Sequence, residues 1–164
     1  MLKSKDQRGD LMKLAEALIL RSDYQKRIEQ LKVRINNNII VQEGDKPSEN
    51  PVKLIIKLKE LQNELEDLIK KINRTNNNSL FNKEKSISDV LTERDMLLER
   101  RNILSNIAMS ASQREDRYSN SEIKKISVVD VSKIQDEVDI LSKDYRILDT
   151  KIQEKNWLID LIEE

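Results

Sequence analysis

The stretch "LIIKLKELQNELEDLIKKI", residues 54–72, decides the fold class. Six of its apolar side chains alternate steps of four and three residues along the chain: Leu54, Leu58, Leu61, Leu65, Leu68 and Ile72. A 3.5-residue average places such side chains on one stripe of an α-helix, as in the seam of a coiled coil. Acidic and basic residues fill the positions between them and predict a solvated surface.

The same spacing recurs elsewhere, and turn-forming residues separate the segments. Gly44, Pro47 and Pro51 interrupt the chain before the leucine stripe, and Pro51 suits a first helical turn. The predicted helices span about 11–41, 51–75, 86–112 and 131–162. The sequence therefore predicts an all-α protein, an elongated four-helix bundle with antiparallel, coiled-coil-like packing.

Composition supports long helices and excludes several functions. Aromatic residues make up 3% of the 164 residues, charged residues 37%, and Gly and Pro number two each, as is typical of long helices. Basic and acidic side chains balance at 30 each, which argues against a nucleic-acid partner. The chain has no Cys and no His, so a thiolate nucleophile, the commonest general base and the commonest transition-metal ligand are missing. We therefore predict no enzyme activity, no cofactor and no metal site.

The ends and one internal segment depart from the helical pattern. Residues 1–10 are polar and read as a flexible leader before a single helical domain over 11–164, and translation can start at Met1 or at Met12. The segment near 115–130 is irregular or, around "IKKISVV", a short β-prone stretch. Because no signal peptide or membrane-length apolar run occurs, we expect a soluble cytoplasmic protein.

A polar cluster follows the leucine stripe: Asn73, Arg74, Thr75 and Asn76. One interpretation is a helix end whose last carbonyls are satisfied by these side chains, followed by a loop over 74–86. The other is a polar network in which Asn73 and Arg74 fold back onto acids of a neighbouring helix, since Arg tolerates burial when a carboxylate binds it. The two glycosylation triplets here are chance matches without a signal peptide.

Two arginines interrupt the apolar stripe of the helix predicted over 86–112. Arg94 and Arg101 occupy half-steps of a seven-residue repeat. They either belong to a solvated face, with only their stems packed, or they lie on the seam and pair with carboxylates. Such buried pairs fix register and oligomeric state better than they add stability.

The remaining candidates lie on a loop and on the last helix. Arg117 and Tyr118 sit side by side on the irregular segment, where they form a functional group or a packed loop that caps the bundle. On the last helix we expect Asp149 to pair with an arginine of another helix, or simply to join ordinary hydrogen bonds between helices. The candidates of this helix share its last turns: Asp149, Gln153, Asn156 and Trp157. Trp157 is expected to anchor the end of the bundle.

Several stretches together resemble the septicolysin-like family of small bacterial helical proteins. They occur in the same order: "MKLAEALILRSDYQKRIEQLKVRI", "VQEGDKP", "INRTN", "RYSNSEIK", "VDV" and "LDTKIQEKNW". The resemblance implies a small helical protein that forms oligomers, with a hexamer as one form, and the family name implies a pore-forming cytolysin. The family offers no catalytic residues to carry over.

These observations predict a cytoplasmic, self-associating helical protein with a structural or binding role. The expected partner is a second copy of the chain, without nucleic acid. Two alternatives stay open: a pore-forming cytolysin, and a small-ligand binder that uses the Asn, Arg, Asp and Tyr side chains. Apolar residues outside the stripes widen the helix faces and suggest subunit contacts: Leu14, Leu18, Ile55, Ile69 and Leu98.

Overall fold

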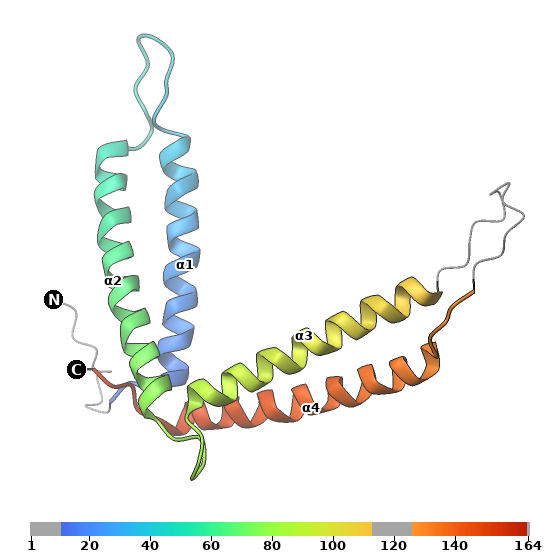
Figure 1. Ribbon diagram of the computed structural model, residues 1–164. Coiled ribbons are helices and arrows are strands. Elements are labelled where there is room, and N and C mark those ends of the chain that lie inside the picture. Colours follow the sequence, from blue (N-terminus) through green and yellow to red (C-terminus); the bar gives the residue numbers. More distant parts are fainter. Residues whose placement is uncertain (1–10, 113–125, 164) are drawn as a thin grey trace, which may run out of the picture. The chain divides into compact units, whose positions relative to one another are not determined.

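A computed structural model describes residues 11–112 and 126–163. Four helices follow one another: α1 (Leu14–Asn36), α2 (Pro51–Asn78), α3 (Ile87–Ser112) and α4 (Val131–Leu158) (Figure 1). The described residues contain no strand, and an isolated antiparallel bridge joins Lys13 to Asp160. The predicted all-α fold is confirmed.

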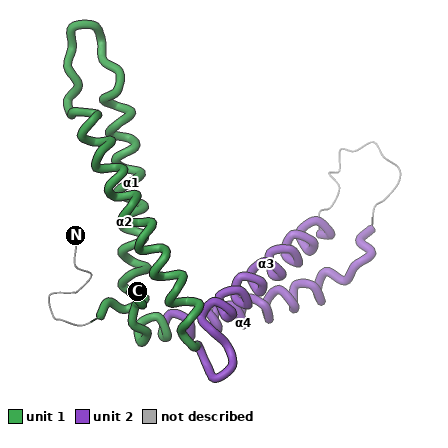
Figure 2. The backbone as a smooth tube through the Cα atoms, turned by 60° about the vertical axis from the view of Figure 1, so that its left-hand side comes forward, with its two compact units in different colours: residues 1–80, 154–164 green, residues 81–153 purple. Residues whose placement is uncertain are grey.

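The chain divides into two compact units (Figure 2). Unit 1 comprises residues 1–80 and 154–164, and so holds α1, α2 and the last turn of α4. Unit 2 comprises residues 81–153, with α3 and the rest of α4. In unit 1 α1 and α2 run antiparallel side by side, and in unit 2 α3 and α4 do the same (Figures 1 and 2). A single domain over 11–164 stays a prediction.

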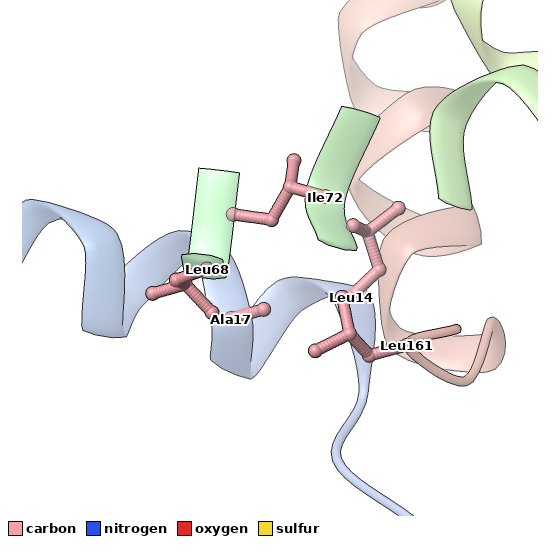
Figure 3. Close-up of a cluster of buried hydrophobic side chains, with 5 residues drawn as sticks. All are labelled: Leu14, Ala17, Leu68, Ile72 and Leu161. Carbon is pink, nitrogen blue, oxygen red and sulfur yellow. The ribbon is translucent and has the colours of Figure 1, made fainter. Parts of the chain in front are cut away.

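The leucine stripe forms the inner face of α2 in unit 1. Leu54, Leu68 and Ile72 are buried, and the three leucines between them are half-buried. Figure 3 shows Leu68 and Ile72 with Leu14 and Ala17 of α1 and Leu161 of the C-terminal segment in one apolar cluster. Full burial of such a side chain contributes about 1.5–3 kcal/mol. Leu14, which the sequence suggested for a subunit contact, is thus part of this core.

Helix α1 ends at Asn36, before the predicted end near residue 41. The buried Asn38 causes the early end, because its Nδ2 donates to the Arg34 carbonyl at 2.9 Å and its Oδ1 accepts from the Glu49 N–H at 2.9 Å. The Arg34 guanidinium also binds the Glu49 carboxylate, with Nε–Oε2 at 2.9 Å. These contacts close the loop between α1 and α2, whose apolar residues 39–41 are exposed.

Helix α2 begins at Pro51, with Asn50 as its N-cap. It continues to Asn78, and the N–H of its C-cap Ser79 donates to the Thr75 carbonyl at 2.9 Å. The predicted loop over 74–86 is therefore wrong in its first five residues, which are helical. At the other end of the chain α4 stops at Leu158 rather than near 162, because the following residues pair with the start of α1: Leu161 N–H donates to the Met12 carbonyl at 2.8 Å.

The segment predicted as irregular or β-prone lies mostly outside the described residues. Its described part, residues 126–130, contains no strand, and α4 begins at Val131. The Asp130 side chain accepts from the Lys133 N–H at 3.2 Å, as an N-cap side chain does.

Ser86 and Asp89 form the start of α3 by a reciprocal pair of hydrogen bonds. Asp89 Oδ2 accepts from the Ser86 N–H at 2.8 Å and from Ser86 Oγ at 2.7 Å, while Ser86 Oγ accepts from the Asp89 N–H at 3.1 Å. Ser86 thus caps the start of α3, and Asp89 is an acidic residue in its first turn, where the helix dipole favours negative charge. The bonds from Ser86 lower the pKa of the Asp89 carboxyl.

The Asp89 cap predicts a pH-dependent stability. Because the folded-state pKa is depressed, the stabilisation is present above the unfolded-state pKa of about 4 and is lost as pH falls through the folded-state value. The Asp89→Asn variant should therefore be less stable than wild type at pH 7, and the difference should shrink in acid. Urea unfolding across pH measures it. The control is Asp139→Asn, an exposed acid of α4, and equal pH profiles for both variants would contradict the assignment.

Candidate interaction surfaces

Thr75 is the buried member of the polar cluster in unit 1. Its side chain has no exposed surface. Its Oγ1 donates to the Lys71 carbonyl at 2.8 Å and accepts from the Ile162 N–H at 2.9 Å. Asn73 and Arg74 are exposed, and Asn76 is half-buried. The polar contact at this helix end is thus made by Thr75, and it holds the C-terminal segment.

The C-terminal segment makes further contacts with the start of α1 and the residue before it. Lys13 Nζ lies 2.6 Å from Asp160 Oδ1, and the Leu14 N–H donates to the Ile159 carbonyl at 2.9 Å. Asn156, in the last turn of α4, is buried. Trp157, expected to anchor the bundle end, is 53% exposed, because the next residue of a helix lies about 100° further around its axis.

Grooves run along both flanks of the α1–α2 pair. One, of about 300 Å³, is lined mainly by charged residues such as Arg27 and Glu60. The other, of about 730 Å³, has Ile28, Leu65 and Ile69 in its wall. Both expose the edge of the α1–α2 seam, because two helices alone cannot enclose the apolar stripe between them.

Tyr24 makes a contact between α1 and α2 that sequence reasoning missed. Burial raises the pKa of its phenol, and a hydrogen bond with the Glu64 carboxylate raises that pKa further. Tyr24 is half-buried and packs beside the apolar core of unit 1. The identity of its partner depends on how the two helices align, which local spacing does not encode.

In unit 2 the two arginines of α3 lie on the seam. Val90 and Ala108 are buried and Leu97 is half-buried, with Arg94 and Arg101 half-buried in the same row. On α4 the facing stripe holds the buried Val138 and Ile152, with half-buried residues between them. The interpretation that placed these arginines on the seam therefore describes the structure better than a solvated face.

Arg94 joins the two helices of unit 2. Its Nη1 lies 3.3 Å from Asp149 Oδ1, and its Nε and Nη2 donate to Asp95 Oδ1 at 3.0 and 2.7 Å. Asp149 thus pairs with an arginine of another helix, as the sequence predicts. Gln153, one turn further along α4, is exposed.

Arg101 has fewer acceptors than Arg94. Its Nη1 donates to Asn102 Oδ1 at 3.0 Å, but its Nε is buried and has no hydrogen-bond partner among the described residues. Arg117 and Tyr118 lie outside the described residues. The structure therefore brings together Arg94 with Asp149, and Thr75 with the C-terminal segment.

In residues 11–112 and 126–163 no group of three acidic side chains is placed to hold a metal ion. No helix in these ranges combines the length and apolar character that crossing a bilayer requires.

The sequence matches a family of unknown function, DUF6847, over residues 21–161. The chain belongs to this family. It is also similar to a solved structure described as a functionally unknown conserved protein from Corynebacterium diphtheriae. The two sequences are 40% identical, the match covers 93% of this chain and 100% of the other, and the TM-score is 0.86. A search of curated proteins finds no match.

Membership of DUF6847 corrects the resemblance drawn from the sequence. Neither the family match nor the structural neighbour points to septicolysin, so that assignment is wrong. Short motifs such as "INRTN" and "VDV" are weak markers of ancestry. The pore-forming alternative took its support from the family name and loses that support.

Removing the Thr75 hydroxyl should destabilise the protein. Thr75→Val keeps the shape but leaves the Ile162 N–H without its acceptor, which costs about 1–3 kcal/mol in the free energy of unfolding. Thr92→Val is the matched control, because Thr92 makes the same bond to the carbonyl four residues back at 3.0 Å but is exposed. Urea denaturation measures both, and an equal loss in the two variants would contradict the role of Thr75.

Replacing Arg101 should stabilise the protein. Arg101→Leu removes a buried Nε without an acceptor among the described residues and continues the apolar stripe, so we expect a gain of about 1 kcal/mol. Arg94→Leu is the control and should give no gain, because it gives up the ion pair with Asp149. Thermal and urea unfolding test both, and a clear loss in Arg101→Leu would show that Arg101 is stabilising where it stands.

Proposed function

We propose that this DUF6847 protein is a non-catalytic helical protein that self-associates and serves a structural or binding role. One observation carries the proposal. Among the described residues, large hydrophobic side chains that are exposed outnumber the hydrophobic side chains that are buried. Soluble monomers expose single apolar residues freely, but rarely expose them in contiguous groups.

Each unit consists of one helix pair, and this architecture explains why so much apolar surface is exposed to solvent. A helix pair has one shared seam, and every apolar residue outside that seam faces solvent. Ile19, Val33 and Ile56 of unit 1 and Ile103 and Ile140 of unit 2 are each more than half exposed. Packing against another surface would bury them at a gain of about 25 cal/mol per Å².

The polar residues give less support to the small-ligand alternative. Asn73 and Arg74 are exposed, and Arg94 already has carboxylates as acceptors. A ligand site that uses them therefore stays a prediction. A cytoplasmic location, a hexamer and the lack of a nucleic-acid partner stay predictions as well.

Sedimentation velocity of the full chain tests self-association. We expect a species heavier than the 19.3 kDa chain at micromolar concentration, with a weight-average mass that falls on dilution. A single 19.3 kDa species at every concentration would refute the proposal.

A further inference from the structure

Unit 2 carries a second apolar row beside the seam. Its members are exposed by 41% to 60%: Met96, Ile103, Ile107, Ile140 and Ile147. Three of them lie on α3 and two on α4. We call this set the α3–α4 ladder.

The ion pair between Arg94 and Asp149 fixes the level of the ladder residues. Because α3 and α4 run antiparallel (Figures 1 and 2), each step forward from Arg94 matches one step back from Asp149. Two steps place Met96 level with Ile147, and nine steps place Ile103 level with Ile140. The ladder therefore has rungs in which one residue of each helix lies beside one of the other.

All five ladder residues lie on the same side of the helix pair. Each directly precedes a seam residue: Leu97, Leu104, Ala108, Leu141 and Leu148. Each is therefore rotated from its own seam by about 100° in the same sense. A two-fold axis perpendicular to the plane of the two helix axes exchanges the helices of an antiparallel pair. Side chains that are rotated from the seam by the same angle and in the same sense therefore lie on the same face of the pair.

Charged residues lie between the rungs of the ladder. Arg100 precedes the seam residue Arg101, and Asp144 precedes the seam residue Tyr145, so both belong to the ladder face. They are one residue apart in level, or about 1.5 Å along the axis. Glu93 and Lys151 occupy equivalent positions near the first rung, although Glu93 already pairs with Lys85 at 2.6 Å.

We propose that the α3–α4 ladder docks the same ladder of a second copy, about a two-fold axis parallel to the helices. This inference rests on the proposed self-association and names its surface. Rotation about this axis leaves the position of each residue along the helices unchanged, and it places α3 of one copy against α4 of the other. Met96 then faces Ile147, Ile103 faces Ile140, and Arg100 faces Asp144 of the second copy, so these three levels match. Ile107 has no apolar counterpart, because Glu137 lies nearest its level on the ladder face of the facing helix. The product is a four-helix bundle with antiparallel neighbours.

The charges select this arrangement over others. A two-fold axis perpendicular to the helices would stack Arg100 on Arg100 and Asp144 on Asp144, and like charges in an interface cost several kcal/mol. A face with both signs in alternation also gives an anionic membrane no net attraction, since such membranes select clusters of Lys and Arg. The ladder face is therefore more complementary to a second copy of itself than to a surface with charges of a single sign.

Charge reversal tests the pairing between copies. Arg100→Glu should face Asp144 with a like charge, and Asp144→Arg should face Arg100 with a like charge, so each variant alone should self-associate at least about tenfold more weakly. An equimolar mixture should regain association, because both contacts between the two variants are then attractive. Mixing cannot repair a contact within one chain, so the recovery identifies the pair as intermolecular. Sedimentation measures all samples, with circular dichroism as the check on folding.

The apolar rungs are tested in parallel. Ile103→Glu should abolish association, whereas Met109→Glu should not, since Met109 lies on α3 with 61% exposure but follows a seam residue and so faces the other flank. A monomeric wild type refutes the proposed function and this inference together. Association that survives Arg100→Glu, Asp144→Arg and Ile103→Glu refutes the ladder alone. Loss in both charge variants without recovery on mixing refutes the two-fold arrangement.

Discussion

Apolar side chains at alternating steps of three and four residues constrain how this protein folds. The spacing confines most of the apolar surface of a helix to one stripe, and a stripe can be buried only against another stripe. In unit 1 the residues from Leu54 to Ile72 meet α1, and in unit 2 the residues from Val138 to Ile152 meet α3. The remaining polar contacts and loops align these two seams, close their ends or interrupt them.

Polar contacts determine how the two helices of a pair are aligned along their axes, which apolar packing alone does not determine. Leucine stripes can slide past each other by whole turns with little loss of packing, whereas an ion pair such as Arg94 with Asp149 is satisfied in one alignment only. Asn38 with Glu49 closes one end of the α1–α2 pair, and Thr75 with Ile162 closes the other. These buried and half-buried polar groups therefore fix how the segments of each unit are positioned against one another.

Much of the fold could be predicted from sequence because the information is local. Every predicted stripe residue from Leu54 to Ile72 is buried or half-buried, and the start of α3 follows from Ser86 and Asp89, three residues apart. The ends of α1 and α4 were missed because the contacts that accompany them lie further along the chain, at Glu49 for Asn38 and at Met12 for Leu161. The ladder was missed for the same reason: Ile103 and Ile140 become neighbours only after Arg94 and Asp149 set the alignment.

The alignment of α3 and α4 along their seam underlies both the ion pair and the ladder, and paired spin labels measure it directly in solution. The chain has no cysteine, so Asn102→Cys with Asp139→Cys gives two labels on exposed, nearly level positions away from the ladder. Dilution with unlabelled protein removes distances between copies. The account predicts one narrow, short distance, in keeping with helix axes about 8–10 Å apart. A broad distribution that reaches the length of a helix, about 40 Å, would contradict it.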